Sequence, residues 1–188
     1  MRGTPYIYQG EEIGMENFER KDISEFDDIG SHGQYQRALE EGFTKEEAMH
    51  FLNLRSRDNT RTPMQWDSSE YAGFSDHEPW LKMTGSQDKI NVESQFNDPN
   101  SIYSFYKKMI SIRKQEDTLV YGDFAEVNTV DDVIGYKRTY QGQEIICFCN
   151  FTNTEQSIPD IQGNILLDNY NNYNPTTLKP YQFVMIKK

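Results

Sequence analysis

The sequence has few cysteines, few positive charges and no long hydrophobic run, and each shortage excludes a class of protein. No stretch of the 188 residues approaches the roughly 18 consecutive apolar residues that a membrane span requires. The 19 lysines and arginines are outnumbered by 30 aspartates and glutamates, which gives a formal net charge of -11. Nucleic acids and anionic membranes bind clustered positive charge, so neither is an expected partner. The first residues also lack the apolar segment and cleavage site of a signal peptide.

Cys147 and Cys149 are the only cysteines. On a strand, residues two apart point to the same face, where both thiols would pack as small apolar groups. A disulfide across one intervening residue would be strained, and the three histidines offer no metal-ligand spacing. We therefore expect free thiols, no metal site and a reducing, cytoplasmic setting.

The first part of the chain carries one strand signal and two helix signals. Residues 4–8 form a short β-type run, and residues 16–31 lack apolar periodicity and are predicted to be loop. A helix is predicted over residues 33–42, ended by Gly42. Thr44 and Glu47 have the spacing of a capping box, which predicts the start of a second helix. The apolar positions expected on its buried face are Ala48, Phe51, Leu52 and Leu54.

The clearest helix is predicted to open at Asp98–Pro99, a cap residue followed by proline at the first helical position. Its apolar residues recur at helical spacing up to Gln115. Residues 133–140 and 144–150 then flank a Gln141–Gly142 turn and predict a hairpin. Residues 165–167 and 183–186 predict two more strands. The tail from about residue 118 is therefore expected to be a small antiparallel β domain.

This order of elements is unusual for one domain, because a lone strand followed by a long helix cannot bury both of its faces. It fits the final βα unit of a (β/α)₈ barrel joined to a β-sandwich. The predicted fold class is α+β.

Residues 57–67, Arg-Asp-Asn-Thr-Arg-Thr-Pro-Met-Gln-Trp-Asp, are the most informative stretch of the chain. Pro63 stiffens the loop, Arg61 offers a fork-shaped cation, and Trp66 offers a stacking face. This set of groups suits a polyhydroxylated ligand. The alternative from the chemistry alone is a structural loop in which Arg61 bonds carbonyl groups and Trp66 is part of the core.

Together with residues 3–15, Gly-Thr-Pro-Tyr-Ile-Tyr-Gln-Gly-Glu-Glu-Ile-Gly-Met, this motif resembles the last third of glycoside hydrolase family 13 enzymes. The resemblance is to the branch of oligo-1,6-glucosidases, dextran glucosidases and trehalose-6-phosphate hydrolases. It implies that the chain is a fragment. Residues 1–116 would be the end of the catalytic barrel, with the eighth strand, loop helices and eighth helix, and residues 117–188 the C-terminal β-sandwich domain.

The same resemblance implies a parent α-glucosidase that hydrolyses α-1,6 or related bonds in short oligosaccharides with retention and without a cofactor. Its catalytic aspartate, glutamate and second aspartate come from earlier strands, so no catalytic residue is assigned here and the isolated chain is predicted to be inactive. Arg61 matches the second arginine of the family motif, which reaches the innermost glucose subsite. It is the one predicted substrate-binding residue.

Two further features of these motifs qualify the resemblance. Glu11 and Glu12 are neighbours, and on a strand they would face opposite ways. They are therefore expected to support the loop rather than to form the acid pair, about 5 Å apart, of a retaining glycosidase. The run Asp28-Ile29-Gly30-Ser31 has glycine where relatives often have glutamate. In this resemblance the chain lacks an acidic contact near the outer sugar.

An interpretation from another class is a non-catalytic β-domain module with a packing or sugar-binding role. In that case the unpaired barrel edge predicts a non-native dimer or aggregation. Saturable binding of isomaltose or glucose that disappears in Arg61→Ala would favour an independent sugar-binding protein.

Overall fold

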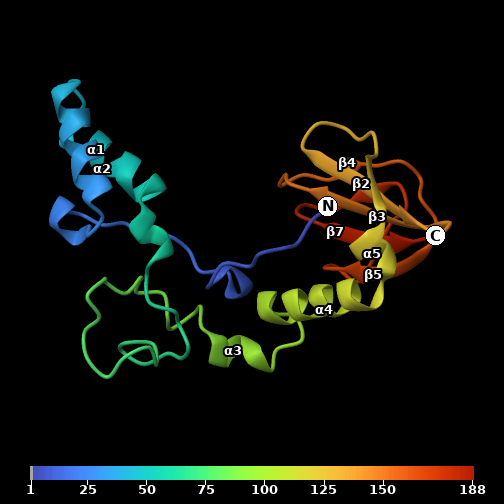
Figure 1. Ribbon diagram of the computed structural model, residues 1–188, viewed down its shortest axis with the longest axis horizontal. Helices are drawn as coiled ribbons and strands as arrows, with labels where there is room; N and C mark the ends of the chain where they lie inside the picture. The colour runs from blue at the N-terminus through green and yellow to red at the C-terminus, as the bar shows by residue number, and fades with distance from the viewer. Residues whose placement is uncertain (1) are drawn as a thin grey trace. The chain divides into compact units, whose positions relative to one another are not determined.

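The computed structural model describes residues 2–188 and contains two compact units (Figure 1). Ile7–Ser104 form a unit that is mainly helix and loop, and the chain up to Tyr6 together with Phe105–Lys188 forms a unit built around a β-sheet. Among the described residues, no helix combines the length and apolar character needed to cross a bilayer.

The first unit contains short helical elements joined by long loops. Helices α1 and α2 pack against each other, as Figure 1 shows in blue and teal. The elements are η1 (Glu11–Ile13), η2 (Ile23–Glu25), α1 (Ile29–Glu40), α2 (Lys45–Arg55), η3 (Arg57–Thr60) and α3 (Val92–Phe96).

Helix α1 begins four residues earlier than predicted, because the Asp28 carboxylate accepts a hydrogen bond from the Ser31 N–H over 3.2 Å. The chain turns at Gly42, whose φ of +94° favours glycine. The predicted capping box of α2 is confirmed by reciprocal hydrogen bonds between Thr44 and Glu47.

The predicted apolar face of α2 is only half buried. Ala48 and Leu52 are each 1% exposed, whereas Phe51 and Leu54 are 44% and 58% exposed. Helical spacing therefore identified the buried stripe, but Phe51 and Leu54 lie outside it.

Two other predicted elements differ from the structure. The strand predicted at residues 4–8 is wrong, because a strand needs a neighbour for its backbone groups and these residues pair with none in the part of the chain described. The long helix, α4 (Ile102–Gln115), begins three residues after Pro99. The Asp98 carboxylate accepts the N–H of Asn100, so Asp98 and Pro99 form a turn that precedes the helix.

The sheet of the second unit has the strand order β1-β2-β3-β7-β5, with every neighbouring pair antiparallel. The predicted hairpin is confirmed, with both turn residues, Gln141 and Gly142, at positive φ. The predicted strands near residues 165 and 183 are also confirmed. The strands are β1 (Asp123–Glu126), β2 (Val133–Tyr140), β3 (Gln143–Asn150), β5 (Asn164–Asp168) and β7 (Phe183–Lys187).

Alternation along β3 and β7 places a separate core on each face of this sheet. On one face, Ile146 and Phe148 pack with Ile158 and Leu178, which lie in or beside a two-stranded sheet of β4 (Gln156–Ser157) and β6 (Thr177–Leu178). Residues of this small sheet thus pack against one face of the large sheet. A helical residue, Leu119 of α5 (Asp117–Tyr121), belongs to the core on the other face.

Cys147 belongs to the core on the α5 face and is fully buried, whereas Cys149 is half-buried. Both are free thiols. Burial raises the pKa of the Cys147 thiol to about 11.

Candidate functional site

The Arg61 loop begins with the short helix η3, which follows directly from the end of α2. Ser56 caps η3 by accepting a hydrogen bond from the Asp58 N–H over 3.2 Å. The Ser56 hydroxyl also lies 2.8 Å from that of Ser31 in α1. The loop therefore starts from a fixed, buried point between the two helices.

Asp58 lies beneath this loop with its side chain fully buried. Its Oδ2 atom accepts hydrogen bonds from the backbone N–H groups of Asp27 and Asp28, over 2.7 and 3.0 Å. Charge-assisted bonds of this kind are stronger than those between neutral groups. Asp58 therefore joins the loop of residues 57–67 to the segment that leads into α1.

Arg61 lies between two carboxylates. Its Nη1 atom is 3.5 Å from Oδ1 of Asp58 and 3.6 Å from Oδ1 of Asp28. The Arg61 side chain is 41% exposed, whereas those of Asp28 and Asp58 are 13% and 0% exposed. The structure thus presents a guanidinium at the surface, held from below by negative charge.

Arg20 supports the same loop and was not identified from the sequence. It is 1% exposed, and it donates hydrogen bonds to Oδ1 of Asn59 over 2.7 Å and to the main-chain carbonyl of Asp58 over 3.3 Å. Burial lowers its pKa, an effect that the Asp58 charge opposes. The rings of Phe18 and Phe26 lie 4.3 and 4.8 Å from its guanidinium.

The only local signal for Arg20 was the presence of two phenylalanines close to it in sequence, which is too common to identify a buried cation. Asn53 of α2 fixes the main chain of Arg20 by accepting its N–H over 3.0 Å and donating to its carbonyl over 2.9 Å. These partners are 33 residues apart in sequence, so no local pattern predicts their contact.

The second half of the motif is anchored in the interior, but its indole is not. Gln65 is fully buried and its amide bonds the hydroxyls of Thr84 and Ser86. Trp66 is 51% exposed. The alternative in which Trp66 belongs to the core is therefore wrong for this structure, and the indole offers an open face on the same loop as Arg61.

Glu11 and Glu12 lie on η1 and not on a strand, which corrects the geometry expected for them. Glu11 accepts the backbone N–H of Tyr8 over 3.1 Å and so holds the turn. Glu12 has one buried carboxylate oxygen without a hydrogen-bond partner among the described residues. Neither glutamate lies in the lining of the pocket described next.

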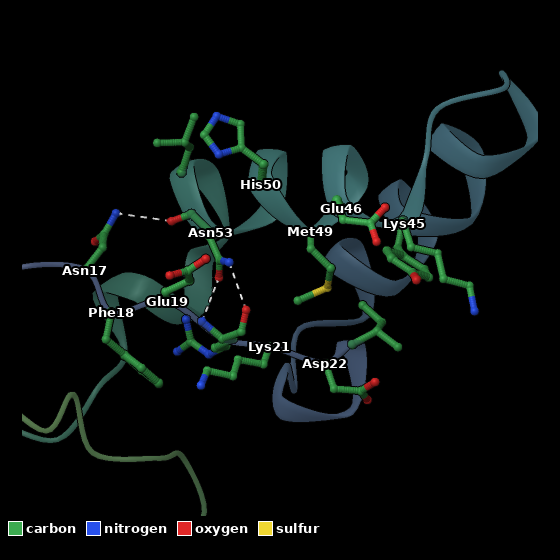
Figure 2. A pocket seen from close by; sticks show the side chains of 14 residues that line it. Asn17, Phe18, Glu19, Lys21, Asp22, Lys45, Glu46, Met49, His50 and Asn53 are labelled. Carbon is green, nitrogen blue, oxygen red and sulfur yellow. Dashed lines mark hydrogen bonds between the residues drawn. The ribbon is translucent and has the colours of Figure 1, made fainter.

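A pocket of about 700 Å³ lies between α2 and the extended segment of residues 17–23 (Figure 2). Its volume is within the range of small-molecule sites. Some of its polar groups are already used: Asn53 bonds the main chain of Arg20 across the pocket, as the dashed lines show, and Asp22 caps η2 by accepting the Ser24 N–H. Arg61 does not line this pocket. No group of three or more His, Cys, Asp or Glu side chains in residues 2–188 could hold a metal ion.

Comparison with known proteins places this loop in a family. The family model described as "Alpha amylase, catalytic domain" matches residues 1–122, which is well over half of the chain. The chain belongs to the α-amylase family, glycoside hydrolase family 13.

Family relatives match the chain along almost its whole length. The oligo-1,6-glucosidase of Halalkalibacterium halodurans is 38% identical over 194 residues, covering 97% of this chain and 35% of the relative. The trehalose-6-phosphate hydrolase of Bacillus subtilis is 36% identical over 200 residues, covering 100% of this chain and 36% of the relative. The chain thus spans about a third of the length of these enzymes.

Solved structures of family members share this fold. The crystal structure of the trehalulose synthase MutB from Pseudomonas mesoacidophila MX-45 matches with a TM-score of 0.92 and 36% identity, covering 99% of this chain and 36% of the synthase. Mutants of that synthase have been crystallised with the substrate sucrose and with glucose. Members of the family with this fold therefore bind sugars.

Proposed function

We propose that this chain is the C-terminal part of a retaining α-glucosidase that hydrolyses α-1,6 or related glucosidic bonds in short oligosaccharides. Residues 1–116 would complete its catalytic barrel, and residues 117–188 would form its C-terminal β-sandwich domain. The names of its relatives support the reaction class, since they include oligo-1,6-glucosidases and glucan 1,6-α-glucosidases. Trehalose-6-phosphate hydrolases match to a similar degree, so the disaccharide itself stays a matter for assay.

In this proposal Arg61 binds hydroxyl groups of the glucose at the non-reducing end. The observation that supports it is the half-exposed guanidinium held by two carboxylates from one side. An arginine fixed in this way donates hydrogen bonds in a defined direction, which positions the sugar for reaction. The exposed indole of Trp66 lies on the same loop and offers a surface for the apolar face of a sugar ring.

The bond-breaking groups of the proposed enzyme lie outside these 188 residues. A retaining glycosidase needs one carboxylate as nucleophile and a second carboxyl group that first donates and then accepts a proton. Following the family resemblance, both come from earlier barrel strands. The isolated chain is therefore proposed to be inactive.

The test joins this chain to the upstream part of the Halalkalibacterium halodurans oligo-1,6-glucosidase and assays the hybrid enzyme on isomaltose, sucrose and trehalose 6-phosphate. We expect the hybrid to hydrolyse at least isomaltose and the isolated chain to hydrolyse none. We expect Arg61→Ala to reduce kcat/KM of the hybrid by roughly a hundredfold or more through loss of positioning. Arg57→Ala, on the same loop, is the matched control. Turnover by the isolated chain would overturn the proposal that the catalytic acids lie elsewhere.

A second candidate is a non-catalytic module with a packing or sugar-binding role. The observation that favours it is that the β domain has a core on each face of its sheet and so has the packing of a self-contained unit. Calorimetric titration of the isolated chain with isomaltose and glucose separates the two candidates. Saturable binding that disappears in Arg61→Ala supports a binding module, and no binding supports a part of a larger enzyme.

A further inference from the structure

The two carboxylate oxygens of Asp58 have different surroundings. Oδ2 accepts the backbone N–H groups of Asp27 and Asp28. Oδ1 is buried and accepts no hydrogen bond from any described residue, but it lies 3.5 Å from Nη1 of Arg61. A buried carboxylate oxygen without a hydrogen bond is unfavourable unless a positive charge lies close to it. Arg61 supplies that charge.

A second cation, the buried Arg20, approaches Asp58 from the main-chain side. Its hydrogen bond goes to the Asp58 carbonyl and not to the carboxylate. Arg20 therefore fixes the backbone at this position, while the Oδ1 atom faces Arg61.

Asp58 also acts on Arg61 through Asp28. One of the two N–H groups that Asp58 binds belongs to Asp28, whose own carboxylate lies 3.6 Å from the same Nη1 atom of Arg61. Oδ2 of Asp28 is used at the start of α1, where it accepts the Ser31 N–H. Asp58 thus holds one side of the guanidinium directly and holds the second carboxylate in place.

We propose that Asp58 is a positioning residue: its carboxylate sets the direction in which the guanidinium of Arg61 meets the sugar. The inference rests on the proposed function of Arg61. The shortest contact of each ion pair is made by Nη1. Nε and Nη2, at the opposite edge of the fork, donate no hydrogen bond to any of the described residues 2–188, so this edge can donate to a ligand hydroxyl. Without the charge of Asp58, the guanidinium of Arg61 would adopt many orientations in the free protein. It would then lose more conformational entropy when a sugar binds.

The first test measures the order of Arg61 in the full chain by NMR of the arginine Nε–H groups. We expect restricted motion and slow hydrogen exchange for Arg61. We expect fast exchange for the exposed Arg57, whose main-chain carbonyl accepts the Thr60 hydroxyl while its side chain lies at the surface. In Asp58→Asn, which keeps the side-chain size and removes the charge, Arg61 is expected to exchange roughly tenfold faster because its partner is lost. Unchanged Arg61 exchange in a folded Asp58→Asn protein would overturn the proposal.

Two variants keep this test interpretable. Glu25→Gln makes the same change of charge in the same unit, at a residue paired with Lys82, and is expected to leave Arg61 unaffected. If Asp58→Asn does not fold, Asp58→Ser takes its place, since its hydroxyl can still accept one backbone N–H. Equal effects of Glu25→Gln and the Asp58 variant would contradict a specific role of Asp58.

The second test is a double-mutant cycle in the hybrid enzyme, measured as kcat/KM for isomaltose. We expect Asp58→Asn to reduce kcat/KM by roughly ten- to a hundredfold, the range for a displaced positioning group. In the Arg61→Ala background the same change should have almost no effect, because Asp58 then has nothing to position. Additive losses would mean a purely structural role. If the hybrid is inactive but the NMR test shows that Asp58 orders Arg61, the proposed function is contradicted, whereas the proposal that Asp58 positions Arg61 still holds.

Discussion

Arg138 and Gly122 are joined by two hydrogen bonds, in which Nε and Nη2 of the arginine donate to the glycine carbonyl over 3.2 and 2.6 Å. Nη1 donates to the carbonyl of Leu119 over 2.7 Å. Arg138 is 1% exposed, and burial lowers its pKa. The three bonds offset the loss of water around the cation and tie the end of α5 to β2.

Replacing Arg138 by methionine keeps much of its apolar stem but leaves the buried carbonyl of Gly122 without its two donors, while the carbonyl of Leu119 keeps only the hydrogen bond from Arg113. We expect the free energy of unfolding of the β domain to fall by about 2 kcal/mol. This free energy is measured by urea denaturation followed by circular dichroism. Lys137→Met is the matched control, because its pair with Glu144 is partly exposed and is expected to contribute less than about 1 kcal/mol. Similar losses in both variants would argue against the buried hydrogen-bond network.

Leu178 tests whether the two-stranded sheet is an integral layer of the β domain. Its side chain is fully buried against the face of the large sheet that carries Phe148. Leu178→Ala is expected to lower the free energy of unfolding by about 2–5 kcal/mol through lost burial and a cavity. Ile134→Ala, at a position that is 52% exposed, should change it by much less. A small effect at Leu178 would mean that β4 and β6 are loosely attached.

Thr44 tests the capping box at the start of α2. Thr44→Ala removes the side-chain acceptor for the Glu47 N–H and should cost about 1 kcal/mol. Hydrogen exchange of the Glu47 amide and urea denaturation of the chain report the local and global effects. Ser68→Ala, at an exposed loop position, is the control and should be neutral. Unchanged protection of the Glu47 amide would contradict the cap.

Cys147 is expected to make the free energy of unfolding of the β domain depend on pH in the alkaline range. The thiol titrates at about 11 in the folded chain against an ordinary pKa of 9.0, because burial disfavours the thiolate. Between these values the unfolded chain has released the proton and the folded chain has kept it, so stability is full below pH 9 and falls as the pH rises towards 11.

We expect this group to lower the free energy of unfolding by about 1–2 kcal/mol at pH 10.5 relative to pH 8. Cys147→Ala should remove that part of the dependence. Burial also raises the pKa of Tyr173, to about 12, so the tyrosine contribution persists in the variant and serves as an internal reference. Identical pH profiles of the two proteins would disprove the role of Cys147.

Local signals predicted those elements whose ends are fixed by neighbours in sequence. The Thr44 capping box and the Gln141–Gly142 hairpin turn were both predicted correctly, because cap and turn geometry is set within a few residues. The strand expected at residues 4–8 failed for the opposite reason. A β-type run becomes a strand only when another strand pairs with it, and residues 2–188 supply none.

The candidate site was predicted only in part. The motif pointed to Arg61 through its chemistry and its resemblance to a family. It did not indicate that Asp58 would face Arg61 from a fully buried position, nor that Arg20 would lie beneath the loop. Asp58 binds the N–H of Asp27, 31 residues away, and Arg20 binds Asn59, 39 residues away. Contacts at such separations depend on how elements pack.

The sequence by itself determined the family and the helices and hairpin whose signals are local, and it singled out the arginine that we propose binds a sugar. The tertiary structure alone decided which side chains become buried around that arginine. The physical reason is that a charge can be held in the interior only where opposite charge and hydrogen bonds meet it. Asp58 is only three residues from Arg61, but Asp28 and the partners of Arg20 come from segments that only folding brings together.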